Sequence, residues 1–228
     1  MTASRTAAHT VASMVDRAYE AIRARILDND WQPGHQALEQ ELALALGMSR
    51  TPVREALIRL QNEGLIEVVP RHGMRVLPLS PTDMRDIYDV LTSLEATAAE
   101  LAAARRPGPA ELEPLEQASR DMSAALRIDD LHAWAEADER FHRLLLELSG
   151  NRLLVSLVEN VWDRAHRARM FTLKLRKKPV QSTREHAAVV QAIRKGDAAA
   201  ARELHRMHRE RGGQELTALL ERYQVRQV

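Results

Sequence analysis

The sequence predicts a mainly α protein in which a winged helix-turn-helix precedes an all-α antiparallel helical bundle. Aromatic residues make up only 4% of the 228 residues, whereas Ala, Leu, Arg and Glu, which lose little side-chain freedom in helices, recur throughout. Apolar residues return at helical spacing over most of the chain, and breaks containing Gly, Pro or Asp separate these stretches. Two short β-prone runs, LIEVV and MRVLPL, flank the turn sequence PRHG and predict one hairpin.

Composition limits the kinds of metal site that the chain can form and the cellular compartment in which we expect it. The chain has no cysteine, so it can form neither a disulfide nor a thiolate metal site, and any metal would need His, Asp, Glu or water. The net charge of +1 does not by itself indicate a nucleic-acid partner, so DNA binding would depend on local charge placement. The N-terminus lacks the apolar core of an export signal, and no run of about 18 apolar residues occurs. We therefore expect a cytoplasmic protein with no membrane partner.

The N-terminal part, residues 11–78, reads as three helices and a hairpin. The stretch 11–29 has apolar residues at helical spacing and stops at WQPG. QALEQELALALG predicts a short second helix closed by Gly47, and Ser49 is a plausible N-cap for a third, with Pro52 tolerated in its first turn. This order predicts a DNA-binding domain at 11–78.

A change at LSPTDM marks a linker at residues 79–81, and the second predicted domain covers residues 82–224. Short breaks such as RPGP, SGN and KGD imply neighbouring, largely antiparallel helices in one bundle. The six predicted helices cover residues 82–106, 109–127, 129–149, 151–176, 179–195 and 197–224. Gly212 and Gly213 are expected to kink or end the last helix.

Two helices joined by a turn at Gly47 form a helix-turn-helix pattern. The N-terminal end of the second helix is the part that meets base edges in the major groove, and the arginine fork suits guanine. The residues predicted to project there are Ser49, Arg50, Thr51 and Arg54. Spacing alone leaves open a second interpretation, in which these arginines form a solvated face beside Glu55.

Residues 11–78 resemble the winged helix of the GntR family of bacterial transcription regulators. The resemblance lies in ELALALGMSRTPVREALIRLQNEGLIEVVPRHGMRV, where SRTPVREAL is close to the family signature. It implies a homodimer bound to double-stranded DNA at a near-palindromic operator. It assigns base reading to Arg50 and Arg54, phosphate or base contacts to Ser49 and Thr51, and a wing contact to Arg71, His72 and Gly73. Some members have an arginine where this chain has Gln40, so that contact is not carried over.

A second constellation begins at ADERFH, where Asp138 and His142 are four positions apart and share a helical face. His186 and His208 lie on later predicted helices, and a bundle can converge ligands from several helices on its interior. Three neutral imidazoles and a carboxylate suit a divalent metal ion such as Zn, Ni or Mn. Spacing alone does not establish which histidines converge.

Residues 82–224 resemble the helical FCD ligand-binding domain of the FadR subfamily. The matching stretches are LEATAAELAA, ADERFHRLLLELSGN and EHAAVVQAIRKGDAAAARELHRMH, and six helices suggest the shorter, VanR-like branch. The resemblance implies that the metal ligands are Asp138, His142, His186 and His208. It places His205 beside the site, and the histidines expected to be solvated are His9, His35, His132 and His166.

The same resemblance implies a small-molecule effector, expected to be a small organic acid whose carboxylate the metal binds. An arginine on the first bundle helix assists in the family, but Leu91 stands at that position here, and Leu91 and Arg164 are the candidates for effector contact. Arg164, Arg167 and Arg169 on the fourth bundle helix could supply a cation or could lie on the surface.

These features predict a DNA-binding transcriptional regulator, expected to be a repressor and not an enzyme, controlled by an effector at the metal. One alternative is a metal-responsive regulator in which the ion is the signal, and another is a purely structural metal. A hydrolase using metal-bound water is less favoured, because no positioned Glu or His base is evident and an enzyme would not explain the winged helix.

Overall fold

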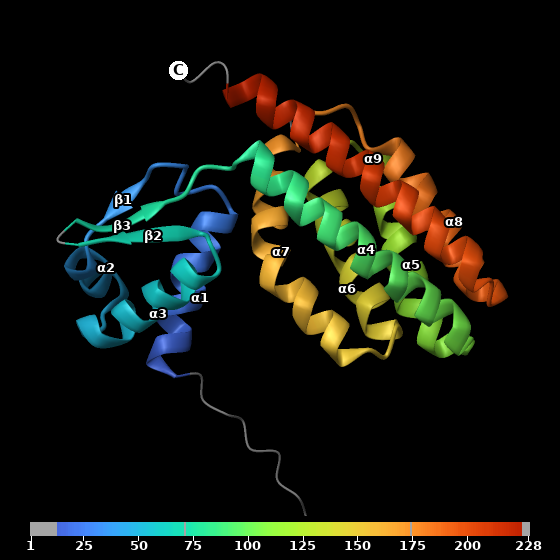
Figure 1. Ribbon diagram of the computed structural model, residues 1–228, viewed down its shortest axis with the longest axis horizontal. Helices are drawn as coiled ribbons and strands as arrows, with labels where there is room; N and C mark the ends of the chain where they lie inside the picture. The colour runs from blue at the N-terminus through green and yellow to red at the C-terminus, as the bar shows by residue number, and fades with distance from the viewer. Residues whose placement is uncertain (1–12, 71, 174, 225–228) are drawn as a thin grey trace, which may run out of the picture. The chain divides into compact units, whose positions relative to one another are not determined.

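The computed structural model of the chain describes residues 13–70, 72–173 and 175–224 (Figure 1). The chain divides into two compact units, Met1–Pro78 and Leu79–Val228. Each unit has its own apolar core. The core of the first unit includes Ile22, Leu57 and Met74, and the core of the second includes Leu115, Phe141 and Val189.

The first unit contains three helices and a small sheet within its described residues. Local signals explain the helix ends: the Ser13 hydroxyl accepts a hydrogen bond from the Asp16 amide at 3.1 Å, and Gly47 adopts φ +64° after the second helix. The elements are α1 (Met14–Leu27), β1 (Gln36–Ala37), α2 (Glu39–Leu46), α3 (Arg50–Asn62), β2 (Ile66–Val69) and β3 (Gly73–Val76).

The predicted hairpin is present and gains a third strand that the sequence did not reveal. β3 lies between β1 and β2, antiparallel to both, with Val69 opposite Gly73 and Ala37 opposite Met74. β1 has only two residues, too few for an alternating apolar pattern to be recognised. β1 pairs with the edge of β3 that does not face β2, at Met74 and Arg75, close to the turn of the hairpin.

The second unit is a bundle of six long helices within the described residues, as predicted. Figure 1 shows them running alongside one another, with α4 beside α9. Their bounds are α4 (Pro81–Arg105), α5 (Pro109–Arg127), α6 (Leu131–Leu148), α7 (Arg152–Thr172), α8 (Val180–Lys195) and α9 (Ala198–Gln224). Ser80, Asp130 and Asn151 cap α4, α6 and α7 by accepting hydrogen bonds from backbone amides.

Gly212 and Gly213 are predicted to kink or end the last helix, and the second of these outcomes is wrong, because α9 continues through both to Gln224. Packing explains Gly213: a β-carbon there would lie only 2.8 Å from the ring of Tyr88 on α4. The absence of a side chain at this point therefore permits the close approach of α4 and α9, which outweighs the low helix propensity of glycine.

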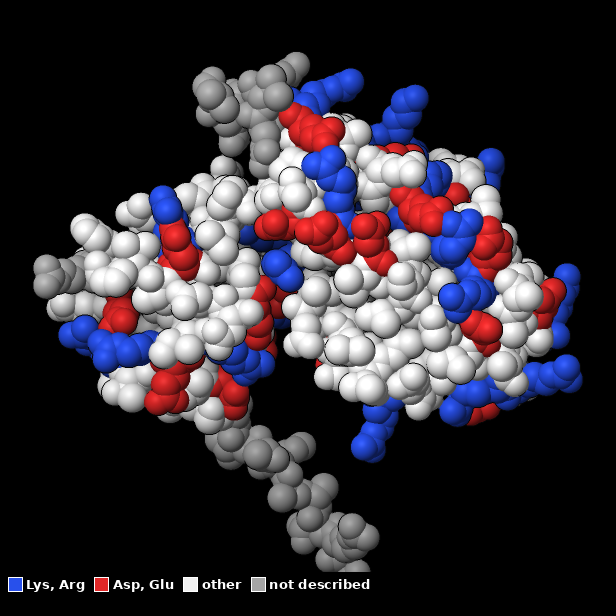
Figure 2. Space-filling view, viewed as in Figure 1, with Lys and Arg blue, Asp and Glu red and all other residues white. Residues whose placement is uncertain are grey.

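Charge is intermixed over the surface in view. On the face shown in Figure 2, basic and acidic side chains alternate, in keeping with the net charge of +1. Arg202 on α9, for example, pairs with Glu100 on α4. Among the helices of the described ranges, none combines the length and apolar character needed to cross a membrane.

Candidate DNA-reading helix and metal centre

The N-terminal end of α3 presents the side chains predicted to read DNA. Ser49 is the residue before the helix, and its side chain makes no capping hydrogen bond. The side chains exposed on this end are Ser49, Arg50, Thr51 and Arg54, whereas the opposite face of α3 is buried through Val53, Ala56, Leu57 and Leu60. Gln40, on α2, is also exposed.

Both arginines are held by one carboxylate, that of Glu39 on α2. Arg54 donates from Nη2 to Glu39 Oε2 at 2.8 Å and from Nε to Oε1 at 3.1 Å, and Arg50 Nη2 lies 3.3 Å from Oε2. The hydrogen bond from Arg54, followed by that from Arg50, lowers the pKa of Glu39 against the opposing effect of partial burial. This contact fixes the direction in which the exposed guanidinium groups point.

The turn of the hairpin contains the three residues predicted to form the wing contact. His72 is exposed, and its amide donates to the Val69 carbonyl at 2.9 Å. Gly73 has φ +78°, and a β-carbon there would lie 2.2 Å from the Ala37 carbonyl oxygen, so this glycine is required by the close approach of β1. Arg71 lies outside the described residues.

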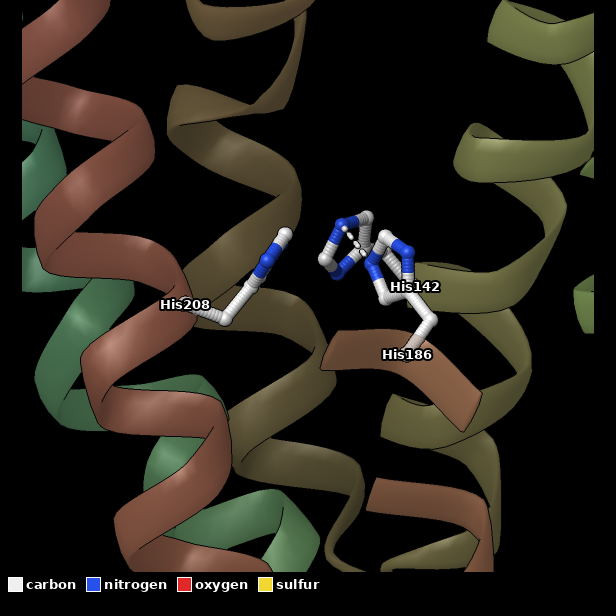
Figure 3. Close-up of side chains that lie close together, drawn as sticks. All are labelled: His142, His186 and His208. Atoms are coloured by element: carbon white, nitrogen blue, oxygen red, sulfur yellow. Dashed lines mark hydrogen bonds between the residues drawn. The ribbon is translucent and has the colours of Figure 1, made fainter. Parts of the chain in front are cut away.

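Three histidines from three helices of the second unit point toward one another, as Figure 3 shows: His142 on α6, His186 on α8 and His208 on α9. One ring nitrogen of each lies within 4.8 Å of those of the other two. His142 Nε2 and His186 Nε2 are 3.3 Å apart. All three side chains are buried.

Asp138 faces the same point from α6. Its Oδ1 lies 3.8 Å from His142 Nε2 and 3.7 Å from His186 Nε2, and its side chain is buried. Its Oδ2 lies 4.0 Å from Nη1 of Arg169 on α7. The structure thus brings together all four residues predicted as metal ligands.

A second layer of polar groups supports this set from behind. Glu95 on α4 is fully buried, with Oε2 at 2.9 Å from His142 Nδ1, 3.0 Å from His205 Nε2 and 2.9 Å from Arg209 Nε. The carboxylate of Glu185 accepts at 2.8 Å from His208 Nδ1. Carboxylates on the Nδ1 atoms leave the Nε2 atoms of these two histidines available to a metal.

Burial sets the protonation of this interior. It lowers the pKa of His142 to about 3 and that of His205 to about 4, so both rings are neutral near pH 7. Burial alone would raise the pKa of Glu95, but the Arg209 guanidinium and the hydrogen bonds from the two histidines more than offset it, and Glu95 stays ionised. Neutral imidazoles are the form in which histidine binds a metal.

The residues present fit a divalent metal ion. Zn–N bonds of about 2.0–2.1 Å at a tetrahedral angle separate two nitrogens by roughly 3.3 Å. His142 Nε2 and His186 Nε2 are 3.3 Å apart, which agrees with that separation. Glu95, His142 and His205 form a second ligand-like group, but Arg209 already supplies the positive charge there. A cation is therefore favoured on the His186 side of His142.

The other histidines and the effector candidates differ in how far they are exposed to solvent. His132 is 74% exposed, as expected, but His166 is not solvated: its side chain is 17% exposed, and Nδ1 lies 2.9 Å from Glu139. His9 lies outside the described residues, and His35 is half-buried and stacked on Trp31. Leu91 is fully buried. Arg164 is half-buried on α7.

Sequence reasoning missed the supporting carboxylates and their cation. Glu95 lies in an alanine-rich helix, on a face whose other residues are apolar. An acidic residue on such a face was the available signal for a buried, paired carboxylate. Arg209 lies four positions after His205, so both reach Glu95 from one face of α9. Glu39 looked like an ordinary acidic residue in the first turn of α2.

Known proteins resemble the chain in both units. Residues 14–76 match the profile of bacterial regulatory proteins of the gntR family, and residues 86–211 match that of the FCD domain. An uncharacterized HTH-type transcriptional regulator in the TAR-I ttuE-ttuC' intergenic region of Agrobacterium vitis is 48% identical over 137 residues, which are 59% of this chain and 80% of that protein.

Two further comparisons are informative. The HTH-type transcriptional repressor RspR of Escherichia coli strain K12 is 28% identical over 179 residues, which are 78% of each chain. The solved structure of E. coli McbR/YncC superposes with a TM-score of 0.77 at 20% identity, covering 93% of this chain and 99% of the other. At that identity the similarity establishes the shared fold.

Proposed function

The chain belongs to the GntR family of bacterial regulatory proteins and carries an FCD domain, so it is a DNA-binding transcriptional regulator. We propose that it is a repressor and that a small organic acid releases it from DNA. The acid binds at a divalent metal held by Asp138, His142, His186 and His208. Convergence of these four buried residues carries the proposal. The name of the similar RspR supports repression. Because its proposed operator is DNA of a bacterium, we place its action in the cytoplasm.

We propose that a homodimer reads a near-palindromic operator through α3. Exposure of Ser49, Arg50, Thr51 and Arg54 at one helix end supports base and phosphate contact there. The wing, through Arg71 and His72, adds a contact to the DNA backbone, whereas Gly73 permits the close approach of β1 to the turn.

Substitution of α3 tests this assignment. Arg54→Ala should weaken operator binding by roughly 5- to 150-fold, the range expected for loss of one bidentate base contact, and relax specificity at one base pair. Arg59→Ala, on the same helix but stacked on Tyr19 with 3.6 Å between the guanidinium carbon and the ring centroid, is the matched control. Equal operator affinity of the Arg54→Ala and wild-type proteins in fluorescence anisotropy would refute α3 as the reader.

The metal would be held by three imidazoles and one carboxylate, and when bound it would supply an electrophilic anchor for a carboxylate. Within the protein, Glu95 and Glu185 orient His142 and His208, and burial excludes water from the ligands. His142→Ala should abolish metal in elemental analysis of the purified protein. The control, His132→Ala, removes an exposed histidine and should leave the metal content unchanged.

Regulation requires that the acid bind the two conformations of the protein with different affinity, since equal affinity would shift nothing. The alternative in which the ion itself is the signal is distinguished by titrating operator complexes with Zn²⁺ alone. Release of DNA by the metal without any acid would favour the metal-responsive regulator over the acid-responsive one.

A further inference from the structure

Arg169 places an incompletely satisfied cation beside the proposed metal ligands. It lies on α7 with 8% of its surface exposed, and its guanidinium carbon is 5.1 Å from the centroid of Trp162. Its Nη1 is 4.0 Å from Asp138 Oδ2 and, within the described part of the chain, makes no hydrogen bond. A buried N–H group of this kind requires an acceptor. An acceptor at this position would also adjoin the metal ligands.

Arg176, in the segment between α7 and α8, is a second cation in the same surroundings. Its guanidinium carbon lies 5.5 Å from the centroid of Trp134, and its buried Nε has no hydrogen-bond partner among the described residues. Burial lowers the pKa of Arg176, the charge of Asp138 opposes this effect, and the like charge of Arg169 adds to it. Trp134 lies one helical turn before Asp138 on α6, so Arg176 and Arg169 contact neighbouring positions of that helix, and both of their charges act on Asp138.

The carboxylates of Glu95, Glu139 and Glu215 in these surroundings already have other hydrogen-bond partners, and Glu215 accepts from Arg211 at 2.9 Å. Glu95 is committed to Arg209, and Glu139 receives hydrogen bonds from Trp162 and Arg143. Asp138 would be shared with a divalent cation, because its Oδ1 faces His142 and His186. With the metal bound, Arg169 would lie beside a second cation while its buried Nη1 has no acceptor among the described residues, a condition that an anionic ligand would relieve.

We propose that Arg169 and Arg176 bind one acidic group of the effector and that the effector is a small dicarboxylic acid, whose other carboxylate binds the metal. This inference rests on the proposed function, because it assigns the effector of the same site. Leu91 is fully buried on α4, so the first helix of the bundle offers no cation at that position. The arginines of α7 and the α7–α8 segment supply it instead. Two fork-shaped donors suit a carboxylate.

Isothermal titration of the Zn-loaded, full-length protein tests the proposal with four acids. Succinate and glutarate should bind at least about tenfold more tightly than butyrate and valerate, which have the same chain lengths but one carboxylate. Arg169→Met should remove this preference while retaining zinc. Arg143→Met is the matched control, because Arg143 also lies near the Trp162 ring but is exposed and bonded to Glu139 at 2.7 Å.

The outcomes separate this inference from the function on which it rests. Equal binding of mono- and dicarboxylates by the wild-type protein, binding of none of the four acids, or an unchanged preference in Arg169→Met would overturn the dicarboxylate subsite, even if zinc and operator binding were intact. Failure of the wild-type protein to hold zinc would instead remove the proposed metal-dependent regulation. If Arg169→Met loses zinc, Arg176→Met reports on the same preference.

Discussion

The buried pair of Glu95 and Arg209 allows a quantitative test of how the interior of the bundle is held together. Glu95 is fully buried, and Arg209 is 2% exposed. The Arg209 guanidinium donates to both carboxylate oxygens of Glu95, and His142 and His205 lie on one of those oxygens. The perturbation is Glu95→Gln, which removes the charge with little change in volume.

The expected cost follows from the position of Arg209. An uncompensated charge left by breaking a buried ion pair costs about 3–5 kcal/mol, a large share of a total stability of roughly 5–15 kcal/mol. Arg209→Met should cost a similar amount, because Glu95 then keeps only neutral donors. The double variant leaves no unpaired charge, so it should be more stable than the sum of the two single effects by about 2–3 kcal/mol.

Urea unfolding of metal-stripped protein measures these values, since bound metal would add its own stabilisation. Trp134 and Trp162 lie in the bundle, so a Trp31→Phe background makes tryptophan fluorescence specific to that unit. Glu100→Gln, which breaks an exposed pair, should change stability by no more than about 1 kcal/mol. Strict additivity of the Glu95 and Arg209 effects would refute the electrostatic explanation.

Three other predictions concern the hairpin, the reading helix and the pH response. Gly73→Ala should lower stability by about 1–3 kcal/mol in thermal unfolding, more than Gly47→Ala, because only Gly73 faces backbone within contact distance as well as having positive φ. Glu39→Gln should raise affinity for random duplex DNA by about two- to fivefold by releasing Arg54, and an unchanged affinity for random DNA in anisotropy would contradict this. Because burial depresses the pKa of His205 to about 4 in the folded state, its stabilising contribution is complete above pH 6.5 and is lost as the pH falls toward 4. His205→Met should therefore reduce the pH slope of metal-free stability by about 1.4 kcal/mol per pH unit in that window, and an unaltered slope would count against a neutral His205.

Periodicity predicted the helices because each long helix has an apolar stripe and recognisable ends. Gly47 and Ser80 mark such ends in sequence as clearly as they do in the structure. β1 and the continuity of α9 were beyond this reasoning, since both depend on tertiary contacts: β1 on pairing with β3, and the glycines of α9 on Tyr88. Local propensity was overridden at both places.

For the site, spacing alone placed Asp138 and His142 on one face, and only resemblance to a family linked them with His186 and His208. The role of Glu95 could not be predicted, because its partners lie 47 and more than 100 residues away. His166 shows the same limit, as its burial depends on Glu139 of a neighbouring helix. Polar groups in the interior are determined by helix packing, which a single sequence does not report.

The continuity of α4 has a mechanical consequence. The first unit ends at Pro78, and α4 begins at Pro81, so only Leu79 and Ser80 connect them. The helix then continues without a break to Glu95. At 1.5 Å per residue, the carboxylate behind His142 is roughly 21 Å along a rigid rod from the point where the chain enters the bundle. Under the proposed function, a ligand that displaced His142 would act through Glu95 on a continuous helix whose N-terminal end is covalently connected to the first unit.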